Sequence, residues 1–177
     1  MIKDNYDMYD SFIIIHGTDT LAYSASAISF MCENLSKPVI FTASQIPISE
    51  WRNDAYGNLL QAMTVAVYWI PEVLIVFNSQ IFRGNWVIKH STTDLEAYKS
   101  FNLPPLGEMN VYFKLHTYLI RPSPSEDEKF NLFMDIESNI NIVYIHPWLQ
   151  EHAFKNSLKN TRGVVLVAYG MGNFPIN

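Results

Sequence analysis

Five consecutive residues near the N-terminus bring together small, hydroxyl-bearing and charged side chains: His16, Gly17, Thr18, Asp19 and Thr20. They follow an apolar run, and in α/β proteins ligands bind at the carboxyl ends of strands. Gly17 permits a tight turn, and Thr18 presents a hydroxyl at the start of a predicted helix, where the helix dipole favours developing negative charge. Because Ser, Thr and Asp are also the preferred N-caps of helices, the spacing leaves a purely structural role open.

Two further polar clusters follow later apolar runs. The first holds Ser44 and Gln45, which offer hydroxyl and amide groups to a ligand, and the second is an Arg-Gly-Asn turn at 83–85 with Lys89 shortly after it. A lysine at this place could activate a hydroxyl. An ordinary turn and a solvated surface lysine are the alternative interpretations.

Metal chemistry and internal disulfides are not expected. The five histidines lack the spacing of zinc ligands, and the single cysteine, Cys32, lies in a helical pattern typical of a small buried hydrophobe. We therefore expect no metal and no cofactor. Because one cysteine forms no internal disulfide and residues 1–10 do not resemble a signal peptide, we expect a reducing, cytoplasmic setting.

The charge balance argues against nucleic-acid binding. Twelve Lys and Arg residues face 17 Asp and Glu, the net charge is −5, and no basic stripe occurs. The longest nearly apolar region, 62–77, is interrupted by Pro71 and Glu72, so we expect no membrane span. A small molecule or another protein is the expected partner.

Short apolar runs alternating with helical patterns must position these clusters. Runs at 12–16, 39–42 and 73–77 predict strands buried on both faces of a mainly parallel sheet. Between them, 21–35 and 58–68 have helical spacing. Strands that alternate with helices imply crossovers on both faces, so the predicted class is α/β with three αβα layers.

The second half of the chain has a different organisation. Residues 111–120 alternate as an edge strand would, and the prolines and acidic residues after Arg121 indicate a linker. Two more apolar runs, 140–145 and 164–168, flank a possible short helix. We therefore predict a first domain over 1–120, a linker over 121–138 and the beginning of a second, smaller α/β domain over 139–177.

Four segments, taken together, resemble one enzyme family. Residues 9–47, with HGTDT after a strand, closely resemble the cytoplasmic, type I L-asparaginases, and residues 70–89 resemble their Arg-Gly-Asn turn and following lysine. Residues 101–107 (FNLPPLG) and 169–175 (YGMGNFP) are similar to further family segments. The resemblance implies a Rossmann-like N-terminal domain, hydrolysis of L-asparagine to L-aspartate and ammonia without a cofactor, and a homo-oligomer when full length.

The resemblance also assigns roles to residues. It implies that Thr18 is a supporting hydroxyl, that Asp19 holds the substrate α-amino group, and that Lys89 polarises Thr18. Thr20, Ser44 and Gln45 are expected to line the substrate pocket. In the family a threonine in a GGTIG motif is acylated, but that motif does not occur in this chain.

This departure leads to three interpretations. The first is an internal piece of an L-asparaginase about twice as long, inactive by itself because the nucleophile is missing. The second is a catalytically dead, truncated paralogue that binds an amino acid or a partner subunit. The third is a glutamine amidotransferase subunit that acts in tRNA-linked amidation and shares HGTDT, although the net charge of −5 disfavours an RNA-facing surface.

Overall fold

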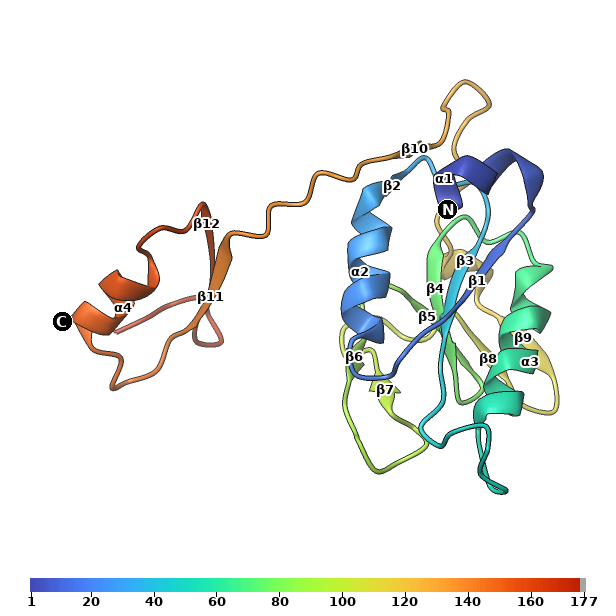
Figure 1. The fold of residues 1–177 in the computed structure, drawn as a ribbon, viewed down its shortest axis with the longest axis horizontal. Helices are drawn as coiled ribbons and strands as arrows, with labels where there is room; N and C mark the ends of the chain where they lie inside the picture. The colour runs from blue at the N-terminus through green and yellow to red at the C-terminus, as the bar shows by residue number, and fades with distance from the viewer. Residues whose placement is uncertain (176–177) are drawn as a thin grey trace. The chain divides into compact units, whose positions relative to one another are not determined.

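The computed structural model describes residues 1–175 and divides into two compact units, Met1–Phe133 and a second that starts at Met134. The first unit is built on a six-stranded sheet in the order β1-β3-β4-β5-β8-β9 (Figure 1). β1, β3 and β4 run parallel, and each later strand pairs antiparallel with its neighbour. The predicted α/β class is confirmed. The strands are β1 (Phe12–Ile15), β3 (Val39–Thr42), β4 (Val73–Phe77), β5 (Gln80–Arg83), β8 (Gly107–Met109) and β9 (Phe113–Leu115).

Helices α2 (Leu21–Met31) and α3 (Ala55–Ala66) cover opposite faces of this sheet (Figure 1). Every residue of β3 and β4 is buried, as their apolar runs predict. Side chains alternate along a strand, so Val73, Ile75 and Phe77 belong to the core under α2, whereas Leu74 and Val76 belong to the core under α3. The two cores make the three predicted layers.

The prediction that the run at 12–16 is buried on both faces is wrong. β1 lies at the edge of the sheet and is only half-buried, and its last residue, Ile15, is 72% exposed. Length and apolar character could not reveal this, because they do not specify how many neighbours a strand has.

The strand β5 has no counterpart in the prediction. It follows β4 through a two-residue turn, in which Asn78 and Ser79 have φ values of 46° and 63°. A hairpin turn of this kind needs positive φ at both positions. Side chains of α3 hold it in place, since Asn78 N donates to Asn58 Oδ1 and Ser79 N to Gln61 Oε1, both at 2.9 Å.

A buried ion pair closes the opposite end of the sheet. Arg83 Nε donates to Glu72 Oε2 (2.5 Å) and Arg83 Nη2 to Glu72 Oε1 (3.0 Å). Nη2 also donates to the carbonyl oxygen of Leu119 (2.6 Å), and the backbone N–H of Arg121 donates to Glu72 Oε1 (2.8 Å). The pair therefore ties the chain leaving β9 to the sheet.

The structure differs from the predicted linker over its first part. Residues 121–133 belong to the first unit. The Phe130 ring stacks on Tyr6 with centroids 3.7 Å apart, and β10 (Asn131–Leu132) pairs with β2 (Cys32–Glu33). The same pairing ends α2 at Met31 rather than at the predicted Leu35. The remaining elements of this unit are α1 (Ile2–Asn5), η1 (Tyr6–Met8), β6 (Ile88–Lys89), β7 (Tyr98–Lys99) and η2 (Thr117–Leu119).

Over residues 134–175, the second unit is a strand-helix-strand motif. The strands β11 (Ile140–Tyr144) and β12 (Gly163–Val167) pair in parallel, and α4 (Glu151–Ser157) lies between them in sequence. The two predicted strands and the short helix are present. Among residues 1–175, no helix has the length and apolar character needed to cross a membrane.

Candidate active site

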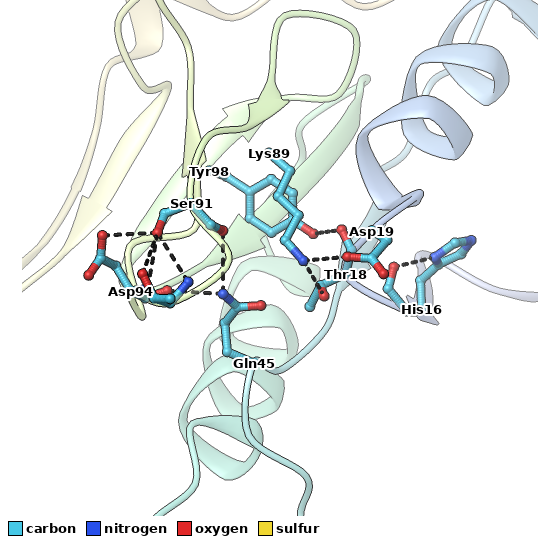
Figure 2. A network of polar contacts seen from close by, with 10 residues as sticks. His16, Thr18, Asp19, Gln45, Lys89, Ser91, Asp94 and Tyr98 are labelled. Atoms are coloured by element: carbon cyan, nitrogen blue, oxygen red, sulfur yellow. Dashed lines mark hydrogen bonds and ion pairs between the residues drawn. The ribbon is translucent and has the colours of Figure 1, made fainter.

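Thr18, Asp19 and Lys89 meet in space (Figure 2). The first two lie in the loop that follows β1, and Lys89 ends β6, about 70 residues later in the chain. Lys89 Nζ donates one hydrogen bond to Thr18 Oγ1 (2.8 Å) and another to Asp19 Oδ1 (2.6 Å). The structure thus brings together the three residues that the sequence predicts as catalytic.

These groups differ in their access to water. The Lys89 side chain is 14% exposed, whereas that of Asp19 is 88% exposed. An ion pair with one member in water contributes little to stability. The exposed carboxylate keeps oxygen lone pairs available to accept a hydrogen bond from a cationic ligand group.

The geometry suits activation of a hydroxyl. A cationic donor 2.8 Å from Thr18 Oγ1 stabilises negative charge that develops on that oxygen when its proton leaves. The structure places Nζ within hydrogen-bonding distance of this oxygen, which is the contact that polarisation of Thr18 by Lys89 requires.

Tyr98 is a fourth member of this group. Its hydroxyl donates to the carbonyl oxygen of Thr18 at 2.5 Å, and the residue is 1% exposed (Figure 2). Burial first, and the nearby Asp19 charge second, raise the pKa of the Tyr98 phenol. The sequence contains no signal for Tyr98, since it lies 80 residues from Thr18 on a strand of only two residues.

The start of α2 does not use the predicted cap. Thr20 occupies the N-cap position without a side-chain capping hydrogen bond, and it is exposed. The capping interpretation of residues 18–20 is therefore wrong, because Thr18 and Asp19 bind Lys89 instead. His16 lies beside them and shapes the turn, with Nδ1 2.8 Å from the Gly17 carbonyl oxygen and Nε2 3.0 Å from Ser24 Oγ. A carbonyl only accepts, so Nδ1 is the donor in its contact with Gly17.

Ser44 and Gln45, which were predicted as one polar cluster, lie in two different places. Ser44 lines a largely apolar pocket of about 360 Å³, together with Ile15, His16, Thr42, Ala43, Ile48, Ala55 and Leu59. Gln45 turns toward the hairpin of β6 and β7, where its Nε2 donates to the carbonyl oxygens of Asp94 (3.1 Å) and Ser91 (3.4 Å) (Figure 2). Gln45 therefore supports the segment that carries Lys89.

Ser91 and Asp94 give this segment its shape. Ser91 Oγ donates to Asp94 Oδ2 (2.9 Å) and accepts from the backbone N–H groups of Thr93 (3.2 Å) and Asp94 (3.1 Å). A Ser-Thr-Thr-Asp sequence that bonds its own backbone is a local turn signal. Sequence reasoning missed this signal, which begins two residues after Lys89.

Residues 1–175 contain no cluster of side chains that could bind a metal ion. No set of three or more His, Cys, Asp or Glu side chains lies close enough together there to hold an ion.

A family model, related sequences and a solved structure all point to the same family. A family model described as "Asparaginase, N-terminal" matches residues 1–121. The chain is 43% identical to L-asparaginase 1 of Escherichia coli strain K12 over 99% of its own length, and 40% identical to L-asparaginase of Dirofilaria immitis over 98%. The crystal structure of L-asparaginase I from Vibrio cholerae superposes with a TM-score of 0.90 at 41% identity, over 99% of this chain. A glutamyl-tRNA(Gln) amidotransferase subunit of Pyrococcus abyssi is 28% identical over 92% of the chain.

The chain spans about half the length of the E. coli and Vibrio proteins and less than a third of the Dirofilaria protein. It covers 52% of the E. coli protein, 30% of the Dirofilaria protein and 54% of the Vibrio chain. The matched segment contains the whole loop 16–20 and the hairpin that carries Lys89. On the family match and the identity over nearly its full length, the chain belongs to the asparaginase family.

Proposed function

We propose that this chain supplies the Thr-Asp-Lys half of an L-asparaginase active site, in a protein that hydrolyses L-asparagine to L-aspartate and ammonia. The observation that carries the proposal is the bridge from Lys89 Nζ to Thr18 Oγ1 and Asp19 Oδ1. It joins a nucleophile-type hydroxyl, a carboxylate and a cation in one cluster at the end of β1.

Each residue has a role in this proposal. Asp19, open to solvent, accepts hydrogen bonds from the α-ammonium group of the substrate. Thr18 orients a water or hydroxyl, and Lys89 stabilises the negative charge on the Thr18 oxygen. Thr20, Ser44 and Gln45 are proposed at the pocket rim, with Gln45 acting through the Lys89 hairpin.

The covalent steps need a further threonine. Its oxygen attacks the side-chain amide carbon, the C–N bond breaks, and the threonine proton passes to the nitrogen, which leaves as ammonia. Water then cleaves the resulting ester, which frees the threonine hydroxyl and releases aspartate. No Gly-Gly-Thr sequence occurs in these 177 residues. We therefore propose that the chain binds the amino acid but by itself releases no ammonia.

The amidotransferase alternative has weaker support. The chain is 28% identical to the Pyrococcus abyssi subunit and 43% identical to the E. coli L-asparaginase. The net charge of −5 also disfavours an RNA-binding surface.

Ligand-induced stabilisation of the purified chain tests the proposal. L-aspartate is expected to raise its melting temperature, because a ligand at ten times its Kd stabilises a folded protein by about 1.4 kcal/mol. Succinate, which lacks the α-ammonium group, is expected to produce no shift. Asp19→Ala should abolish the effect of L-aspartate, whereas Asp10→Ala, an exposed carboxylate outside the site, should preserve it.

Two results would contradict the proposal. If neither L-aspartate nor L-asparagine shifts the melting temperature, the cluster does not bind the amino acid. If the chain releases ammonia from L-asparagine, and Lys89→Met abolishes the release, then the claim of inactivity is wrong.

A further inference from the structure

Tyr98 is the residue that joins the two segments of the candidate site. It stands directly across from Lys89 in the ladder between β6 and β7. Its hydroxyl reaches the other segment and donates to the Thr18 carbonyl oxygen at 2.5 Å. One side chain is therefore both the cross-strand neighbour of the lysine and a partner of the threonine backbone.

Packing holds the ring of Tyr98 in place independently of its hydroxyl. It is almost completely buried and meets the Phe77 ring edge-on, with centroids 4.9 Å apart and an interplanar angle of 75°. Phe77 is the last residue of β4, a strand buried along its whole length. The ring therefore connects the hairpin to the rigid sheet.

The hairpin depends on such contacts because β6 and β7 form a two-stranded sheet of their own. A two-stranded hairpin alone is marginally stable. Gln45 supports its tip through Asp94 and Ser91, and Tyr98 supports its base through Thr18. Only the second of these supports touches the residue that Lys89 also binds.

We propose that Tyr98 is a positioning residue, whose hydroxyl sets the place of the Thr18 backbone relative to Lys89 and so keeps the Thr18, Asp19 and Lys89 side chains assembled. The meaning of this role for catalysis rests on the proposed function. Desolvation raises the pKa of Tyr98, so its hydroxyl remains a donor throughout the neutral range.

The variant Tyr98→Phe tests this role with little change in packing, because it keeps the ring against Phe77 and removes only the hydroxyl. The matched control is Tyr112→Phe, at a tyrosine that is 82% exposed. Both are compared with the wild-type chain by NMR of the Thr18 methyl and Lys89 Cε signals, and by titration with L-aspartate far below the melting temperatures.

In Tyr98→Phe, the Thr18 and Lys89 signals are expected to move, and the Kd for L-aspartate is expected to rise about tenfold. Tyr112→Phe should leave both unchanged. A purely structural role would lower the melting temperature without changing the Kd of the folded protein. Unchanged signals and an unchanged Kd in Tyr98→Phe would overturn the inference.

The outcomes separate this inference from the proposed function. If the wild-type chain does not bind L-aspartate but Tyr98→Phe still moves the Thr18 and Lys89 signals, the function fails and the positioning role stands. If Tyr98→Phe does not fold, a measurement on the wild-type chain tests the positioning role instead. Its Tyr98 hydroxyl proton should exchange slowly with water and show a through-space contact to the Thr18 backbone, and a rapidly exchanging proton would refute the role.

Discussion

Replacing Arg83 by Met should strongly destabilise the first unit. Arg83 donates two hydrogen bonds to Glu72 and one to Leu119. Met fills a similar volume but leaves the Glu72 carboxylate, whose side chain is 4% exposed, with the Arg121 backbone N–H as its remaining hydrogen-bond partner in the described structure.

Removing one member of a buried ion pair costs about 3–5 kcal/mol, because the other charge stays desolvated. For a unit of this size, about 3–4 °C of melting temperature corresponds to each kcal/mol. Arg83→Met is therefore expected to lower the melting temperature by roughly 9–20 °C. The double variant Glu72→Gln with Arg83→Met removes the buried charge as well, so it should recover roughly half of the loss or more.

The measurements are thermal unfolding and urea unfolding, both followed by tryptophan fluorescence in a Trp148→Phe background. The three remaining tryptophans, Trp51, Trp69 and Trp86, all lie in the first unit, so the signal reports that unit alone. Asp4→Asn removes an exposed ion pair with the amino group of Met1, within the same unit, and serves as the control, with an expected effect near zero.

A loss of less than about 1 kcal/mol in Arg83→Met would refute the reasoning, since it would mean that the Glu72 carboxylate is solvated. A double variant no more stable than Arg83→Met would refute the claim that the uncompensated charge causes the loss.

Three substitutions and one chemical modification test other features of the same structure. A Cβ at Gly84 would lie 2.9 Å from the Val73 carbonyl oxygen, so Gly84→Ala should lower the free energy of unfolding by about 1–3 kcal/mol. Gly57 lies on α3 with open space around it, so Gly57→Ala should raise the free energy of unfolding by about 0.5–1 kcal/mol in the same urea assay. Burial raises the pKa of Cys32 to about 11, so alkylation should be slow at pH 8 and should accelerate with pH up to about 11; a rate that levels off near pH 9, as for an unfolded thiol, would contradict this. Gln45→Leu removes the amide that bonds Ser91 and Asp94, so hydrogen exchange in residues 91–97 should quicken by about tenfold, and equal exchange in the variant and the wild type would show that the tip needs no such support.

Local sequence predicted the parts of the fold that local physics determines. The runs at 39–42 and 73–77 form the fully buried strands β3 and β4, because a continuous apolar stretch fits a strand with helices on both faces. The HGTDT loop, the Arg-Gly-Asn turn and the lysine are enough to single out Thr18, Asp19 and Lys89 without their contacts. The family resemblance, rather than spacing, connects residues so distant in the chain.

What escaped prediction depends on long-range pairing. The end of α2 at Met31 reflects the pairing of Cys32 with Leu132, and the exposure of β1 reflects its place at the sheet edge. Tyr98 escaped because a buried tyrosine on a two-residue strand has no periodic pattern. The turn at Asn78 and Ser79 lacks the Asn-Gly or Asp-Gly pair that marks such a hairpin, and side chains of α3 supply the missing preference.

The side chains of β4 alternate between two cores, and this has a consequence for how the register of the strand is fixed. All five residues are apolar, so sliding the strand by one position would exchange the two sets with little change in composition. The apolar side chains inside β4 therefore do little to fix its register. The alignment is encoded at the ends, by Glu72 with Arg83 on one side and by the turn at Asn78 and Ser79 on the other. Substitutions at those few polar positions, rather than in the strand between them, would change the register of β4 and with it the position of the Lys89 hairpin.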